Sequence, residues 1–262
     1  MKSFSILRPS SFSRICRLAI IMAVAIACST LAFAAPIHDA ARQGNVKKVQ
    51  SLIQADPTLI NSLDSHGDTP LHLASLHGEV AVAKVLVDAG ANVNAKDNAG
   101  AFTPGDMWGV ISSSNHQDPV GLLTVPGLIT QPAGHGYTPV DMAMFSIHHK
   151  EMLEYLVSKG GDVNAQAASG ATPLFWAVMR DQKDDAEFLL AHGANVNAAT
   201  AYGDTILDMA LHMQFGSMIQ LIVDKGADVN AIDQSQHRPL TYALSMDDHR
   251  WAQLLQKHGA HE

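Results

Sequence analysis

The sequence is poor in cysteine, and this scarcity limits the chemistry that it can support. Its only cysteines, Cys16 and Cys28, both lie within the first 34 residues of the chain. If that segment is removed, no thiol remains for a disulfide, a thiolate metal site or a cysteine nucleophile. We therefore expect the stability of the folded chain to come from packing.

Basic residues are also scarce. The chain has 17 Lys and Arg against 25 Asp and Glu, a formal net charge of −8 at pH 7. Removal of the first 34 residues would take four basic residues with it and lower the net charge to −12. Because nucleic-acid binding needs clustered Lys and Arg to neutralise phosphates, we expect no nucleic-acid partner.

Common enzyme signatures are missing as well. The sequence contains no G-x-S-x-G, no H-E-x-x-H and no G-x-x-x-x-G-K. These motifs form nucleophile elbows, zinc sites and phosphate-binding loops. We therefore predict that the protein has no catalytic residues and no cofactor and is not an enzyme. Catalysis through Asp106, His116 and Asp118 is the alternative that the sequence leaves open.

The first 34 residues have the features of a secretory signal peptide. Four basic residues precede an apolar run from Leu18 to Cys28, and Ala32-Phe33-Ala34 forms an A-x-A cleavage site. The apolar run is shorter than the roughly 20 residues that a membrane span needs. We predict a signal peptide over residues 1–34, no membrane span after cleavage, and a periplasmic or secreted protein. Lipidation of Cys28 is an alternative.

One short segment recurs along the remaining chain. "GDTPLHLA" at 67–74 returns as "GYTPVDMA" at 136–143, "GATPLFWA" at 170–177, "GDTILDMA" at 203–210 and "HRPLTYA" at 237–243. A second motif follows in phase: "AGANVNA" at 89–95, "KGGDVNA" at 159–165, "HGANVNA" at 192–198 and "KGADVNA" at 225–231. The segment "APIHDAARQGN" at 35–45 fits the same frame. Two motifs that stay in register over several copies indicate a repeat architecture.

Each copy predicts two helices and a turn. Thr69 suits a helix cap and Pro70 suits the first helical turn, where a missing N–H costs nothing. Apolar pairs such as Leu189-Leu190 mark the buried side of the second helix. Gly90 follows that helix, where a left-handed cap favours glycine. A unit of this size cannot bury its apolar face alone, so we expect the copies to stack.

A period near 33 residues with a T-P-L-H-x-A core resembles the ankyrin repeat, and the resemblance covers roughly residues 35–262. It implies an all-α solenoid of about six helix-turn-helix repeats, and the chain looks like a bacterial exported member of the family. The repeats would lie near 35–64, 65–97, 136–166, 167–199, 200–232 and 233–262. In the family, the histidine at the position of His72 hydrogen-bonds the adjoining turns, so we assign His72 to the scaffold.

The interval between the second and third repeats is about one repeat too long. Residues 98–135 form either an insertion between repeats or a degenerate repeat, in which Thr103-Pro104 would keep the phase. We favour an insertion, because Pro119 and Pro126 would break the second helix. The segment either covers neighbouring repeats or presents an apolar surface to a partner, through Trp108, Leu122, Leu123, Leu128 and Ile129.

The resemblance also indicates where a partner would bind. Ankyrin repeats bind proteins through the turn tips and the exposed side of the first helices. At these positions we expect an exposed apolar row of Leu76, Phe145, Met179, Met213 and Met246, with burial between repeats as the alternative. The predicted partner-binding residues are His66, Asp68, Leu76, His77, Trp108, Tyr137, Phe145, Met179, Arg180, Tyr202, Asp204, His212, Met213 and Met246.

We therefore predict a monomeric, non-catalytic protein-interaction module of the cell envelope that binds and shields, inhibits or scaffolds a partner protein. One alternative is a histidine-based metal-binding envelope protein, since the chain has 14 histidines. Zinc needs three or four convergent ligands, and His66, His116 and His135 form the candidate set. A second alternative is a specific neutraliser of a toxin or a secreted enzyme.

Overall fold

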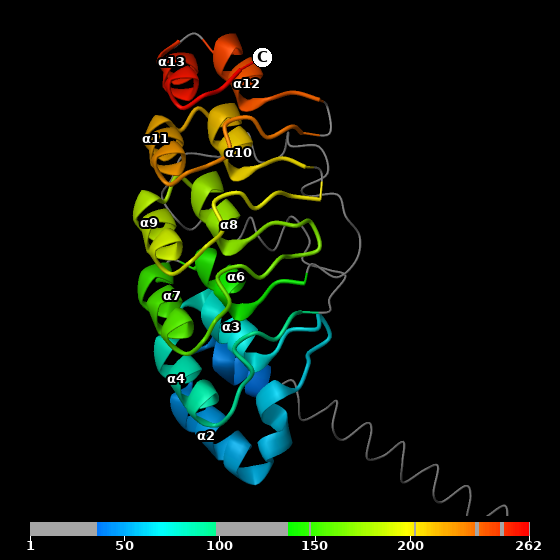
Figure 1. Cartoon of the computed structure of the whole chain (residues 1–262). Coiled ribbons are helices and arrows are strands. Elements are labelled where there is room, and N and C mark those ends of the chain that lie inside the picture. Colours follow the sequence, from blue (N-terminus) through cyan, green and yellow to red (C-terminus); the bar gives the residue numbers. More distant parts are fainter. Residues whose placement is uncertain are drawn as a thin grey trace, which may run out of the picture.

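A computed structural model describes residues 36–97, 136–146, 148–201, 203–233, 236–246 and 249–261. These residues form pairs of helices that stack one above another into an elongated solenoid (Figure 1). Within the described ranges there is no β-strand, and one isolated bridge joins Ala199 to Thr205. The predicted all-α solenoid is confirmed. No helix in the same ranges has both the length and the apolar character to cross a membrane.

The helices form two layers. The first layer holds the inner helices: residues 36–42, α3 (Pro70–His77), α6 (Pro139–Met144), α8 (Pro173–Met179), α10 (Ile206–His212) and α12 (Pro239–Ser245). The second layer holds the outer helices: α2 (Val46–Ala55), α4 (Val80–Asp88), α7 (His149–Ser158), α9 (Lys183–Ala191), α11 (Gly216–Asp224) and α13 (Arg250–Lys257). A short 3₁₀ helix, η1 (Pro57–Asn61), follows α2. Extended loops project from the inner layer (Figure 1).

Threonine caps begin four of the inner helices, as the Thr-Pro motif predicts. The hydroxyl oxygen of Thr69 accepts a hydrogen bond from the backbone N–H of His72, and Thr138, Thr172 and Thr205 cap their helices in the same way. In three repeats the side chain of the third helical residue bonds back to the cap. Such reciprocal caps satisfy N–H groups that the helix itself leaves unpaired. In the last repeat Arg238 stands at the cap position and forms no such bond.

The hydrophobic core lies between the two layers and continues from repeat to repeat. Leu71 and Leu174 of the inner layer and Leu86, Leu153 and Leu189 of the outer layer are fully buried. Gly90, just after α4, has a φ of 101°. An added Cβ would meet nothing within 4 Å there, so the left-handed conformation and not the space selects glycine.

An asparagine of one repeat bonds the backbone of the next along the loops that follow the outer helices. Asn164 Nδ2 donates to Gly193 O at 2.9 Å, and Asn164 Oδ1 accepts from Asn195 N at 2.7 Å. The same exchange joins Asn94 to Gly160 and Asp162, at 3.0 and 2.8 Å. The repeats that contain α3–α4 and α6–α7 therefore stack directly on each other.

The extended loops, which we call fingers, close with a backbone hydrogen bond at their base. Thr200 N donates to Asp204 O at 2.9 Å, and the fingers at 64–68, 167–171 and 233–237 have the same bond between residues four apart. In the second finger the bond joins Asp97 N to Tyr137 O at 2.9 Å, across 40 positions of sequence. Asp97 and Tyr137, on either side of residues 98–135 in sequence, thus meet at the base of one finger. The nature of residues 98–135 stays a prediction, as does that of the signal peptide, because both segments lie outside the described residues.

A charged contact that is largely buried crosses from α7 to the neighbouring outer helix α9. His149 Nε2 at the start of α7 lies 3.0 Å from Asp185 Oδ2 in the first turn of α9. The side chain of His149 is 26% exposed and that of Asp185 is 5% exposed. The carboxylate, as hydrogen-bond partner, raises the pKa of His149 above its ordinary value. The contact therefore favours the protonated imidazole.

The core register predicts the effect of one truncation. Leu189→Ala should lower the free energy of unfolding by about 2–5 kcal/mol, because the side chain is fully buried and its removal leaves a cavity. Urea denaturation measures this loss. The matched control is Leu244→Ala in α12, whose side chain is 42% exposed and whose loss should cost less than about 0.5 kcal/mol. Equal losses for the two variants would contradict the assigned core.

The His149–Asp185 contact predicts a pH dependence. A raised pKa in the folded state gives stabilisation that is complete below the unfolded pKa, about 6.5, and is lost as the pH rises through the folded value. The difference in unfolding free energy between the parent chain and His149→Gln should therefore be larger at pH 5.5 than at pH 8.5, by about 1–2 kcal/mol. In a chain that also carries Asp185→Asn, His149→Gln should show no such trend, because the carboxylate that pairs with the imidazole is absent.

Candidate interaction surface

His72 is part of the scaffold, as predicted. Thr69 N donates to His72 Nδ1 at 3.1 Å, so Nε2 carries the proton and donates to Ala95 O and Tyr137 O, each at 3.0 Å. One imidazole thus bonds its own helix cap and both sides of the second finger. Burial lowers the pKa of His72 to about 4, which keeps it neutral at physiological pH.

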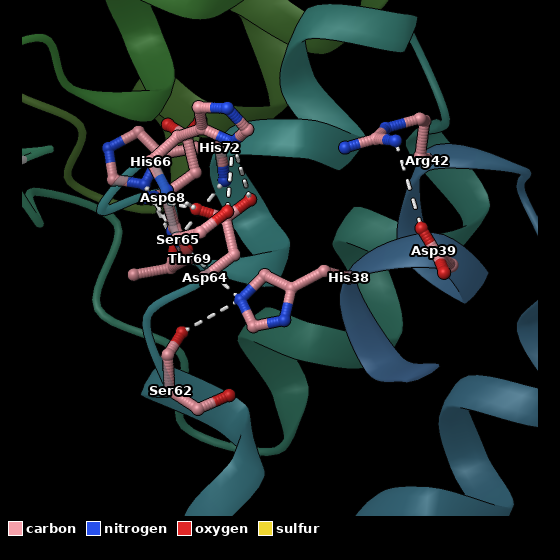
Figure 2. A network of polar contacts seen from close by, with 10 residues as sticks. All are labelled: His38, Asp39, Arg42, Ser62, Asp64, Ser65, His66, Asp68, Thr69 and His72. Atoms are coloured by element: carbon pink, nitrogen blue, oxygen red, sulfur yellow. Dashed lines mark hydrogen bonds and ion pairs between the residues drawn. The ribbon is translucent and has the colours of Figure 1, made fainter. Parts of the chain in front are cut away.

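His38 has the same role one repeat earlier. Its Nε2 lies 3.0 Å from both Ser62 O and Asp68 O, and Figure 2 shows the ring reaching toward the loop that carries Asp64. In that loop Asp64 Oδ1 accepts from His66 N at 2.8 Å and from Asp68 N at 3.0 Å. The base of the first finger is therefore fixed by buried polar contacts, and its tip carries the exposed ring of His66.

Carboxylates are buried beneath the first two fingers. Asp141 takes the place of His72 in its repeat, and its Oδ2 accepts from Thr138 N at 2.9 Å and from Thr138 Oγ1 at 2.8 Å. Burial raises the pKa of Asp141 to about 7 and that of Asp97 to about 6. Burial, with Asp64 and Asp97 nearby, raises the pKa of Asp68 to about 7. These groups hold the fingers and do not face solvent.

The expected exposed apolar row is wrong for four of its five residues. Leu76, Phe145, Met179 and Met246 are all less than 9% exposed and belong to the hydrophobic core, while Met213 is half-buried. Met213 and Met246 also stand one position further from their helix caps than the other three, so the five side chains share no register. The alternative of burial between repeats holds for the four.

An aromatic cluster accounts for part of this burial. Tyr137 of the second finger, Phe145 after α6 and Trp176 of α8 meet edge to face, with ring centroids 5.0–6.1 Å apart. Such contacts stabilise beyond the area that they bury. Sequence analysis assigned Tyr137 and Phe145 to partner binding and missed Trp176, whose position gives no signal beyond that of an ordinary apolar helix residue. Asp68, also predicted to bind a partner, is buried too.

The other described candidates reach solvent from the fingers and the ends of the inner helices. His66 and His212 are exposed, and His77, Arg180 and Asp204 are half-buried. Arg180 reaches back to the preceding repeat, where its guanidinium donates to Met144 O. Trp108 and Tyr202 lie outside the described residues, as do Asp106 and Asp118. The partner-binding role of all these residues stays a prediction.

A second group of side chains, which sequence analysis did not single out as a unit, gathers at the last two repeats. The ring of Tyr242 in α12 lies 4.3 Å from that of His212 and 5.7 Å from that of His237, between centroids. The Tyr242 hydroxyl donates to Asp233 Oδ2. The separation of His212, His237 and Tyr242 in sequence hides this grouping, since they come from two repeats and from a finger as well as helices.

In the part of the chain that the structure describes, no group of ligands supports the hypothesis of a histidine-based metal site. No three or more His, Cys, Asp or Glu side chains there are placed to hold an ion. Of the candidate set, His66 is exposed at the tip of the first finger, while His116 and His135 fall outside the described ranges. Metal binding by that set therefore stays untested.

Comparison with known proteins identifies the repeat. The family model of ankyrin repeats matches the chain three times, over residues 19–97, 114–200 and 140–233. The protein YahD of Escherichia coli (strain K12) is 33% identical over 147 residues, which cover 53% of this chain and 68% of YahD. The serine/threonine-protein kinase VIK of Arabidopsis thaliana is 47% identical over 57 residues, which are 22% of this chain and 13% of that protein.

A solved structure has the same fold. The crystal structure of an ankyrin repeat domain from Acinetobacter baumannii AYE aligns with a TM-score of 0.65 at 25% identity, over 86% of this chain and 98% of that chain. The threonine caps, the bridging histidine and the stacked helix pairs are the features that the repeated sequence motifs predict. The chain belongs to the ankyrin repeat family.

Proposed function

We propose that this protein binds another protein of the cell envelope through its fingers and inner-helix ends, without catalysis, and thereby shields, inhibits or scaffolds it. Ankyrin repeats indicate a protein–protein interaction module, and this coarser statement follows from the family match. The envelope location is supported by the basic and apolar sequence of residues 1–34 and its Ala32-Phe33-Ala34 end. The identity of the partner is left to experiment.

One observation carries the proposal: side chains that build the stack repeat from unit to unit, whereas those at the inner-helix ends differ. The cap is threonine in four repeats, and the outer loops supply an asparagine to the next unit at Asn61, Asn94, Asn164 and Asn230. The inner helices end at Arg42, His77, Met144, Met179, His212 and Ser245, of which Arg42, His212 and Ser245 are exposed. A scaffold with uniform joints has no need of this variety, and a surface shaped to one partner does.

A capture experiment tests the proposal and the face that it assigns. The full-length chain with a C-terminal tag is expressed in the cells that make it, and proteins bound in the envelope fraction are identified. Two variants alter the proposed face, one at its beginning (Arg42→Ala, His66→Ala and His77→Ala) and one at its end (His212→Ala and Ser245→Ala). A control alters exposed outer-helix residues (Lys84→Ala, Glu187→Ala and Gln220→Ala).

We expect one protein to be recovered by the parent chain and by the outer-helix control, and to be reduced about tenfold with at least one face variant, because a few interface residues carry most of the binding energy. All variants should keep the stability of the parent within about 1 kcal/mol, since the altered side chains are exposed or, at His77, half-buried. Equal recovery by every variant, or loss with the outer-helix control alone, would contradict the assigned face. Recovery from non-envelope fractions only would contradict the location.

A further inference from the structure

We propose that the base of the second finger is controlled by protons: it is closed while the buried carboxyl groups of Asp97 and Asp141 are neutral, and it opens locally when they ionise. The second-finger base consists of these two residues with Gly136, Tyr137 and Thr138. The inference goes beyond the proposed function, because it concerns the conformation of the scaffold and holds whether or not the fingers contact a partner.

The two carboxyl groups take part in the contacts that close this finger. Asp97 N donates to Tyr137 O at 2.9 Å, and Asp97 Oδ1 accepts from Tyr137 N at 2.9 Å. Asp141 Oδ2 accepts from Thr138 N at 2.9 Å and from Thr138 Oγ1 at 2.8 Å. One carboxyl group therefore joins the two sides of the finger, and the other holds the start of α6 directly after it.

The surroundings of both groups are unfavourable to a charge. Asp97 is 4% exposed and Asp141 is fully buried, and Asp97 Oδ2 and Asp141 Oδ1 have no hydrogen-bond partner among the described residues. Within the same part of the chain, no lysine, arginine or histidine forms an ion pair with either group. Because a carboxylate removed from water needs a counter-charge and hydrogen bonds, this geometry favours the neutral acid.

The second finger is unusual in carrying both carboxyl groups. In each described finger, one position supplies the N–H that closes the base, and another is the third residue of the helix that follows. These two positions hold Asp64 and His72, Asp97 and Asp141, Ala167 and Phe175, Thr200 and Asp208, and Asp233 and Thr241. The third finger has neither carboxyl group, so the chain contains its own control.

The other titratable groups on the first finger, α3 and the second finger add no positive charge. Burial raises the pKa of Asp68 to about 7, with Asp64 and Asp97 contributing to the rise. Burial lowers the pKa of His72 to about 4, so its imidazole is neutral near pH 7. Burial also raises the pKa of the Tyr137 hydroxyl. The nearby groups are thus negative or neutral, and they disfavour a further negative charge.

Lysine and the remaining packed elements do not reverse this preference. Lys96 favours the charged form of Asp141 less than burial disfavours it, and its Nζ donates to Gln166 O at 2.8 Å. The third finger and α8 carry no titratable side chain over residues 167–171 and 173–179. In α7, which also packs against α6, His149 pairs with Asp185, Tyr155 is half-buried, and Lys150, Glu151 and Glu154 are exposed.

The direction of the pH effect follows from the burial. Burial raises the pKa of Asp141 to about 7 and that of Asp97 to about 6, against about 3.9 for an aspartate in water. A pKa raised in the closed state gives stabilisation that is complete below about pH 4 and is lost as the pH rises through the closed-state values. The second-finger base is therefore most firmly closed in acid and opens more often above pH 6–7.

Hydrogen exchange of the full-length chain tests the proposal. Exchange is followed by mass spectrometry at pH 5.5 and pH 7.5, and rates are corrected for the intrinsic effect of pH. We expect the protection of the Asp97 amide to fall at least about tenfold between the two pH values, because opening releases protons from the carboxyl groups. The Ala167 amide, which donates to Ala171 O at 2.9 Å in the third finger, should change less than about threefold.

Two amide variants separate ionisation from structure. Asp97→Asn and Asp141→Asn keep an oxygen that can accept the same hydrogen bonds, but neither side chain can ionise. We expect each to reduce the pH dependence at the second-finger base, and the double variant to bring it within about twofold. Asp184→Asn, exposed in α9, removes one carboxyl group elsewhere and should keep the pH dependence of the parent.

The proposal is overturned if the Asp97 amide is equally protected at both pH values, or if the Ala167 amide loses as much protection, since the opening is then not local. It is also overturned if the double variant keeps the tenfold change or if Asp184→Asn removes it. The ratio between two pH values is taken within each variant, so a uniform loss of stability cancels. The comparison of the two fingers in the parent chain decides even where a variant does not fold.

Discussion

Every repeat of this protein depends on its neighbour, because a unit of two short helices has too little apolar surface to bury on its own. The contacts across repeat boundaries therefore hold the fold. Leu189 is buried within a core that continues through all repeats, and Asn164 ties its loop to the backbone of the next unit. The imidazole of His72 donates to backbone carbonyls on both sides of the second finger, which connects its own repeat to the next one. The side chains of His72 and Asn164 are engaged in these contacts, so they are part of the scaffold.

The same constraint explains how the stack stays continuous although residues 98–135 separate the two sides of the second finger in sequence. A finger contributes to stacking through its base, and the base keeps the backbone bond from Asp97 to Tyr137 and the return bond from Tyr137 N to Asp97 Oδ1, both 2.9 Å. Asn94 meets Gly160 as its counterparts meet theirs. The loop-closure cost of additional residues grows only slowly with their number. An insertion at a finger tip is thus compatible with an unbroken stack.

Much of the fold could be predicted from the sequence, because its determinants are local and repeat. Thr69, Pro70 and Gly90 are selected by the backbone conformation of a few neighbouring residues, and the burial of Leu189 follows from the period of one helix. The candidate site was harder to predict, because the exposure of a side chain depends on which residues of the neighbouring repeats lie next to it. Phe145 stands at a position that Arg42 and His212 leave open in other repeats, yet Tyr137 and Trp176 cover it. No pattern within one repeat encodes that contact. The grouping of His212, His237 and Tyr242 could not be predicted for the same reason.

Departures from the repeat then become informative about function. Where a scaffold position changes and keeps its cap contact, as when Asp141 replaces His72 and still bonds Thr138, the demands of the helix cap explain the residue. Where the contact disappears, as at Arg238, stability gives no reason for the residue. A role other than stacking is expected at such a position, and the guanidinium of Arg238 donates instead to His261 Nε2.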